Sequence, residues 1–174
     1  MENIELIFKN LQVEYLEPLL FQELKINRNS IIRSHFYDDF LQKNLEFKDI
    51  INLKEHFSHP GTGNIFLNGI DIGIRIGSVM VVISFDEVFG DVVLNFPTGN
   101  LENTDKTVNS EMFYKLIQQS MRICKNLNFE KIIIGYEPAE DEDMVICIVN
   151  KRGILWSQNY NLTKDLLPEF EKQS

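Results

Sequence analysis

Apolar and polar side chains alternate through the middle of the chain, and this period of two constrains the fold more than any other feature. Four isoleucines take every second position after an Asn-Gly pair: Ile70, Ile72, Ile74 and Ile76. Residues 79–85 and 92–96 repeat the alternation on either side of a turn at 87–90. Such a period indicates strands that bury one face.

The Asn68-Gly69 pair is typical of the type I′ turn that closes a two-residue hairpin. Residues 65–67 and 70–76 are therefore predicted to form a hairpin around it. With 79–85 and 92–96 added, we expect an antiparallel meander of three or four strands at the centre of the fold.

A helix is predicted after the meander, which ends at Pro97 and Gly99. Thr107 or Asn109 can cap it, and its core-facing stripe consists of Phe113, Leu116, Ile117, Ser120, Cys124 and Leu127. The segments 131–136 and 144–149 then predict a second hairpin, and a third strand at 154–156 follows the turn at 150–153. Thr163 is a candidate cap for a short C-terminal helix.

The N-terminal third has weaker signals. Residues 4–8 favour a first strand, and Pro18 can open a short helix that ends at Leu24. Ser30 can cap a longer helix to about residue 44, and a shorter helix is expected at 49–57. The longer helix is inferred from near-helical spacing of apolar residues: Ile32, Phe36, Phe40 and Phe47.

These elements predict an α+β fold, a mostly antiparallel sheet of about six or seven strands with helices packed on one face. Residues 1–174 are expected to form a single domain, because the chain contains no repeat, low-complexity tract or Pro/Gly/Ser linker. The first fifteen residues lack the basic start and apolar run of a signal peptide. The longest apolar runs fall far short of the roughly 20 residues of a membrane span. A cytoplasmic location is therefore expected, with no membrane partner.

The chain carries a formal net charge of −9. The excess negative charge is concentrated in residues 84–143, which contain twelve acidic and five basic side chains. Nucleic acid and anionic membranes both require a positive surface, so this charge argues against either as a ligand. It favours a basic protein partner or serves solubility.

No pattern of metal ligands or nucleophiles is convincing, so no cofactor, metal site or catalytic residue is predicted. His56 and His59 have an HxxH spacing but lack further ligands, and a zinc site needs three or four. Residues 61–63 resemble a phosphate loop only superficially, because no Lys-Ser/Thr follows them. Cys124 belongs to an apolar helical stripe, which argues against a pairing with His35, and Cys124 and Cys147 are expected to be buried thiols.

Two groups of carboxylates remain. Asp86, Glu87 and Asp91 flank the turn between two central strands, where they could perform acid/base chemistry, bind a divalent cation, or form a solvated hairpin tip. The second group lies in residues 137–143, which contain five carboxylates in seven positions. This segment lacks the glycine and glutamate of an EF-hand loop. Its carboxylates repel one another unless solvent, salt or a cationic partner relieves them, so it is either a solvated connection or an interface.

The acidic segment also carries a family resemblance. Gly135-Tyr136-Glu137-Pro138-Ala139-Glu140-Asp141-Glu142-Asp143, with Ile83-Ser84-Phe85-Asp86-Glu87 upstream, resembles small bacterial immunity proteins of polymorphic toxin systems. The resemblance covers residues 70–156. An immunity superfamily with an N-terminal Gly-Trp-type signature is not matched, because the only tryptophan is Trp156.

The resemblance implies a non-catalytic protein that neutralises a cognate toxin domain by covering it, with a basic, nuclease-like toxin as the partner. Carboxylates would then imitate the charge of the nuclease substrate. The implied contacts are Glu137, Glu140, Asp141, Glu142 and Asp143, with Asp86, Glu87 and Asp91 as neighbours and Tyr136 as an aromatic anchor.

Two other hypotheses stay open. A metal-dependent hydrolase would use the carboxylates near Asp86 and Asp91 and would place them in a pocket with a cation. A self-associating regulatory module would pair an exposed sheet edge with a second copy. The sequence leaves the oligomeric state undetermined.

Overall fold

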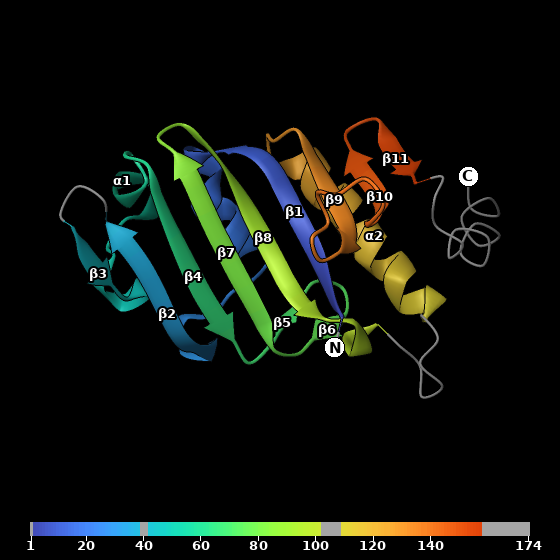
Figure 1. The fold of residues 1–174 in the computed structure, drawn as a ribbon, viewed down its shortest axis with the longest axis horizontal. Helices are drawn as coiled ribbons and strands as arrows, with labels where there is room; N and C mark the ends of the chain where they lie inside the picture. Colours follow the sequence, from blue (N-terminus) through green and yellow to red (C-terminus); the bar gives the residue numbers. More distant parts are fainter. Residues whose placement is uncertain (1, 39–41, 102–108, 158–174) are drawn as a thin grey trace.

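A computed structural model describes residues 2–38, 42–101 and 109–157. Its centre is a nine-stranded sheet in the order β11-β10-β9-β1-β8-β7-β4-β2-β3, in which every neighbouring pair is antiparallel (Figure 1). The strands of this sheet are β1 Asn3–Gln12, β2 Ile31–Asp38, β3 Lys43–Leu45, β4 Gly61–Leu67, β7 Val79–Asp86, β8 Phe89–Pro97, β9 Lys131–Tyr136, β10 Val145–Asn150 and β11 Gly153–Trp156. The α+β class is confirmed, but the sheet is larger than the predicted six or seven strands.

The helices pack on one face of this sheet (Figure 1), as predicted. The longest is α2, Ser110–Asn126, which lies against β9 and β10. The remaining helical elements are short: η1 Val13–Tyr15, η2 Pro18–Glu23, η3 Arg28–Ser30, η4 Phe47–Asp49, α1 Leu53–His56 and η5 Thr98–Asn100. No helix in the described residues has the length and apolar character needed to cross a membrane.

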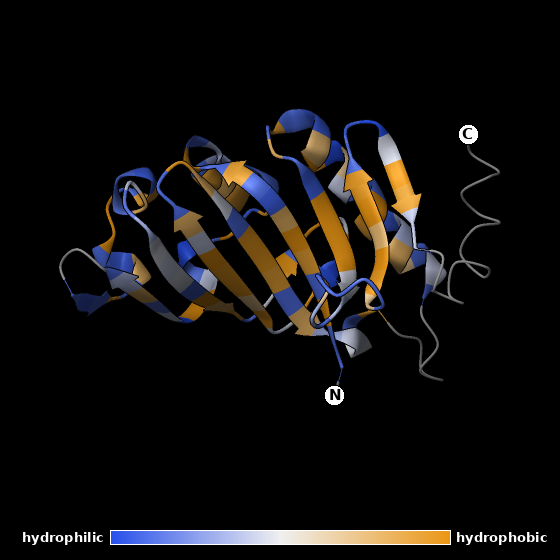
Figure 2. Ribbon diagram, turned by 45° about the horizontal axis from the view of Figure 1, so that its top comes forward, coloured by the Kyte–Doolittle hydropathy of each residue, from blue (hydrophilic) through white to orange (hydrophobic). Residues whose placement is uncertain are grey.

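The strand periodicity of the sequence appears directly in the core. Val81, Ile83 and Phe85 of β7 point into it, as do Val92, Leu94 and Phe96 of β8, and each is at most 1% exposed. Figure 2 shows that the strands are predominantly hydrophobic and that the turns between them are mostly hydrophilic. The predicted stripe of α2 is buried as well, and Asn109 caps the helix by accepting a hydrogen bond from the amide of Met112. Thr107, Phe40 and the helix proposed after Thr163 lie outside the described residues.

The predicted helix at 30–44 is wrong, because these residues form β2 and β3 at one edge of the sheet. The spacing of apolar residues was misleading because Ile32 does not share the environment of Phe36: Phe36 is buried in the core, whereas Ile32 is 66% exposed. Pairing with β4 satisfies the backbone of β2 along the length of the strand. Hydrogen bonding between β2 and β4 has thus outweighed the helical spacing of apolar residues in the sequence.

The hairpin predicted around Asn68-Gly69 is also wrong, although the four isoleucines are buried as expected. β4 pairs instead with β2 and β7, and the segment after Gly69 folds on itself into β5 Ile70–Asp71 and β6 Arg75–Ile76. This second sheet packs on α2, where a Cβ on Gly73 would lie 3.6 Å from the Lys115 carbonyl oxygen. The short helix expected from Pro18 to Leu24 is confirmed by η2, which has Leu24 as its C-cap, whereas the helix expected at 49–57 is reduced to the end of η4 and the single turn α1.

Candidate functional site

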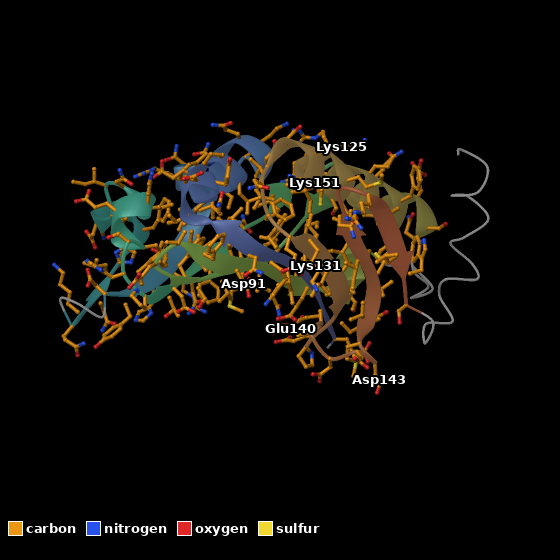
Figure 3. All side chains as sticks on the ribbon, turned by 90° about the horizontal axis from the view of Figure 1, so that it is seen from above. Asp91, Lys125, Lys131, Glu140, Asp143 and Lys151 are labelled. Carbon is orange, nitrogen blue, oxygen red and sulfur yellow. The ribbon has the colours of Figure 1, made fainter. Side chains whose placement is uncertain are left out.

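The acidic loop, residues 137–143, joins β9 to β10 and stands on the face of the large sheet opposite α2. We call this side of the sheet the open face. Figure 3 shows Glu140 and Asp143 projecting from the sheet on the side away from the helices. The predicted hairpin connection is confirmed, since Ile133 of β9 pairs with Ile148 of β10. The loop does not extend straight into solvent but folds back over β9 and β1.

A small apolar cluster holds the loop against the open face. Ala139 is fully buried and packs with Ile7 of β1 and Ile133 of β9. Its approach depends on Gly135, because a Cβ at that position would lie 2.9 Å from the Ala139 Cβ and 2.5 Å from the Met144 carbonyl oxygen. Gly135 and Ala139 therefore have a packing role.

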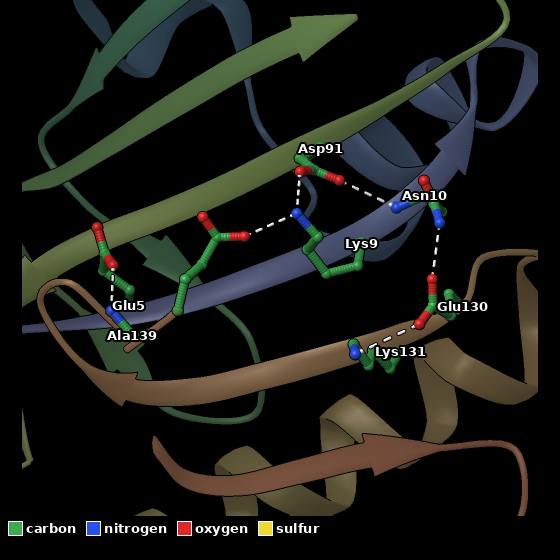
Figure 4. Close-up of polar contacts among 8 residues, drawn as sticks. Glu5, Lys9, Asn10, Asp91, Glu130, Lys131 and Ala139 are labelled. Carbon is green, nitrogen blue, oxygen red and sulfur yellow. Dashed lines mark hydrogen bonds and ion pairs between the residues drawn. The ribbon is translucent and has the colours of Figure 1, made fainter. Parts of the chain in front are cut away.

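Polar contacts with β1 and β8 reinforce this packing. The Ala139 amide donates to Glu5 Oε2 at 2.9 Å (Figure 4), and Asn95 Nδ2 donates to Glu5 Oε1 at 3.2 Å. At the start of the loop, Asn3 Nδ2 donates to Glu137 Oε2 at 2.8 Å. The loop backbone closes on itself, since the Met144 amide donates to the carbonyl oxygen of Asp141 at 2.8 Å. These bonds hold the loop in one arrangement on the sheet.

Lys9 links the two predicted groups of carboxylates. Its ammonium lies 2.7 Å from Glu140 Oε1 and also pairs with Asp91, whose other oxygen accepts from the Asn10 amide at 3.0 Å (Figure 4). Partial burial acts to lower the pKa of Lys9, but the hydrogen bonds and attraction of Asp91 and Glu140 outweigh it and raise the pKa above the usual lysine value. The protonated form of Lys9 is therefore favoured between Asp91 and Glu140.

A further pair of contacts extends this network to the start of β9. Asn10 Nδ2 donates to Glu130 Oε2 at 2.7 Å, and Lys131 lies 3.3 Å from the other Glu130 oxygen. The hydrogen bond from Asn10, followed by the one from Lys131, lowers the pKa of the Glu130 carboxyl. The Glu130 carboxylate is thus favoured by neighbours from β1 and β9.

The structure brings together only some of the predicted site residues. The side chains of the loop are exposed at Glu137, Glu140, Asp141, Glu142 and Asp143, and Asp91 is half-buried beside them. Asp86 and Glu87 are exposed in the β7–β8 turn, away from the loop contacts. Tyr136 packs against the main core, on the opposite face from Ala139, so it is not placed as an anchor beside the loop.

The carboxylates near Asp91 do not form a metal centre in this structure. Asp91 is engaged by Lys9 and the Asn10 amide, and the described residues include no group of three or more His, Cys, Asp or Glu side chains suited to a metal ion. His56 contacts aromatic rings instead, with its ring centroid 4.8 Å from that of Phe57. It is half-buried, not a simple surface histidine as expected.

The other candidates have structural roles. His35 is exposed on β2, whereas Cys124 lies under β10 at the far end of the sheet, with its sulfur 3.7 Å from the Val149 carbonyl oxygen. Both cysteines are buried free thiols, as predicted, and burial raises the pKa of Cys124 to about 11. Gly63, from the segment that superficially resembles a phosphate loop, lies in β4. A Cβ there would be 2.2 Å from the Phe36 ring, so this glycine makes room for the aromatic side chain.

Sequence reasoning missed the residues that support the loop, namely Glu5, Lys9 and Ala139. Glu5 and Lys9 lie more than 120 positions from the loop, and nothing in the local sequence of β1 marks them as its partners. One usable signal existed, because Glu5, Ile7 and Lys9 alternate with the buried residues Leu6 and Phe8. This alternation places all three on one face of β1.

Comparison with known proteins gives one family match and one fold match. The model of the PABL017 Cdi1I immunity protein family matches residues 2–151. A chain in the crystal structure of the toxic C-terminal tip of CdiA from Pseudomonas aeruginosa in complex with immune protein matches with a TM-score of 0.65 and 19% identity. The match covers 84% of this chain and 94% of that one, and at this identity it supports the shared fold. No curated protein sequence matches.

Proposed function

The chain belongs to the PABL017 Cdi1I immunity protein family, and from this membership we propose that it protects its producer by binding a basic cognate toxin domain through the acidic loop and the residues around it. The family membership confirms the predicted class, a non-catalytic immunity protein that acts by binding a toxin. The complex of a CdiA toxic tip with immune protein, to which the fold is similar, supports a CdiA-type tip as the partner.

The proposed contact surface, the acidic patch, consists of the exposed loop carboxylates and Asp91. Within the patch, Lys9 pairs with Asp91 and Glu140, while the side chains of Asp141, Glu142 and Asp143 are exposed. Concentrated negative potential accelerates encounter with a basic domain and disfavours partners of like charge. A nuclease toxin needs a basic surface for its phosphates, which is why a nuclease-like domain fits this patch.

Anchoring the loop also favours tight binding. A loop that is already held by Ala139, Glu5 and Lys9 loses less conformational entropy on complex formation than a mobile one. The anchoring supports a role for the loop beyond solubility, because a merely solvated turn needs neither a buried alanine nor a cation from another strand.

The test uses the full chain and the C-terminal toxin domain encoded beside its reading frame. Co-expression should restore growth to cells that produce the toxin domain, and calorimetry should detect a one-to-one complex. A toxin domain from an unrelated system serves as the control for specificity. Absence of both protection and complex formation with the neighbouring toxin would refute the proposed function.

A further inference from the structure

One row of side chains crosses the open face from the foot of the acidic loop to β2. The strand registers pair Gly135 with Glu5, Glu5 with Asn95 and Asn95 with Met80. Beyond β7, Met80 pairs with Phe66 and Phe66 with Arg33. The loop covers the first end of this row, at Gly135 and Glu5. The far end has no covering segment among the described residues.

That far end contains a shallow hollow of about 410 Å³. Phe66 and Met80 provide half-buried apolar walls, and Asn95, only 7% exposed, contributes at its base. The Arg33 guanidinium stacks over the Phe66 ring, with its central carbon 4.0 Å from the ring centroid, and so covers one face of that ring. The full lining is Asn3, Ile32, Arg33, Phe66, Leu67, Ser78, Val79, Met80, Asn95 and Pro97.

The hollow is continuous with the acidic patch. Asn3 lines the hollow and also donates a hydrogen bond to Glu137 of the loop. Asn95 donates to Glu5, which in turn accepts from the Ala139 amide. Met80 lies two strands from Glu5, a separation of about 10 Å at ordinary strand spacing. A single protein surface seated against the loop would therefore also reach the hollow.

We propose that this hollow receives a large apolar side chain of the cognate toxin domain, next to basic groups of the toxin that meet the acidic loop. The inference rests on the proposed function and adds to it the position and chemistry of the main anchor. Interfaces gain most of their binding energy from a few large side chains inserted in pockets and surrounded by polar contacts. Here Phe66 and Met80 form the pocket, and the loop carboxylates form the charged rim.

The chemistry of the lining selects the occupant. Arg33 places a cation beside the hollow, which disfavours a lysine or arginine there, whereas Phe66, Met80 and Pro97 favour an aliphatic or aromatic group. The toxin's basic residues are left to pair with Glu137 and its neighbours. Charge and apolar contact are thus separated along the row, and they should affect different steps of binding, since steering governs association and packing governs dissociation.

The test measures association and dissociation rates of the full chain with the toxin domain encoded beside it. Phe66→Ala and Met80→Ala should each speed dissociation by about 10- to 30-fold, with association changed by less than about twofold. Met80→Trp, which fills the hollow without removing apolar contact, should have the same effect. Thr62→Ala is the control, because Thr62 lies on the same face of β4 at its opposite end, and it should leave both rates unchanged.

Circular dichroism and thermal melting confirm that each variant is folded before its rates are compared. If the wild-type chain binds the toxin and the folded hollow variants, Met80→Trp included, dissociate at the wild-type rate, the hollow is not an anchor site and this inference fails. The proposed function survives that outcome. Failure of the wild-type chain to bind its neighbouring toxin would instead remove the proposed function and this inference with it.

Discussion

Ala139 packs over Gly135, four positions earlier in the chain, so that the acidic loop rests on the strand from which it emerges. The contact exists because Gly135 has no side chain, since a Cβ there would approach the Ala139 Cβ to 2.9 Å. The loop therefore presents its carboxylates from a fixed position on the open face. Its apolar underside joins Ile7 and Ile133 in the small second core.

Gly135→Ala should displace the loop and lower the free energy of unfolding by about 1–3 kcal/mol, because the added methyl group must push against the Met144 carbonyl as well as Ala139. Urea unfolding would measure the loss, and hydrogen exchange should become faster at the amides of residues 137–143. Gly99→Ala is a matched control, since a Cβ at Gly99 would meet no atom within 4 Å. Equal behaviour of the two variants would contradict the packing role of Gly135.

Reversing two loop charges, Asp141→Lys with Glu142→Lys, should slow association with the basic toxin domain by about 10-fold or more at low salt. The difference from wild type should shrink as salt is added, because mobile ions screen exposed charges. Glu14→Lys with Glu55→Lys changes the net charge equally at exposed positions in η1 and α1. Stopped-flow rates that are equally low for both pairs would point to net charge and not to the loop.

Arg122→Ala should lower the free energy of unfolding by about 2–3 kcal/mol, because it removes the cation that lies 2.6 Å from the carboxylate of Glu23. Glu23 is only 7% exposed, and Asn126 would be its one remaining side-chain donor among the described residues. Lys115→Ala provides the comparison, because it breaks an exposed pair with Glu111 on the same helix. That variant should unfold in urea almost as the wild type does.

Stability should also fall as the pH drops below about 6.5. Burial lowers the pKa of His56 below its ordinary value of 6.5, against a weaker raising effect of Asp38. Just below that pH the unfolded chain binds more protons at this site than the folded protein, so acid favours unfolding. His56→Gln should flatten the dependence of the urea midpoint on pH between about 7.5 and 5.5. His35→Gln, at an exposed position on β2, should leave the slope as it is in the wild type.

The strands from residue 79 onward could be predicted because they are apolar, alternating in β7 and continuous in β9, and each pairs with a neighbour close in sequence, as β7 does with β8 and β9 with β10. The N-terminal third could not. β1 pairs with β8 and β9, both more than 75 positions away, and β2 lies between the edge strand β3 and β4, which follows a long connection. Local propensity carries little information about such pairings, since their free energy comes from tertiary neighbours.

Periodicity, capping residues and charge were enough to predict the fold class, the strands from residue 79 onward, the long helix and the acidic character of residues 137–143. The position of those carboxylates on the sheet came from long-range strand pairing. Inserting β1 between β8 and β9 brings Lys9 and Glu5 beneath the loop, and the resulting contacts span more than 130 positions. Such contacts depend on how distant strands align, which no local pattern of residues encodes.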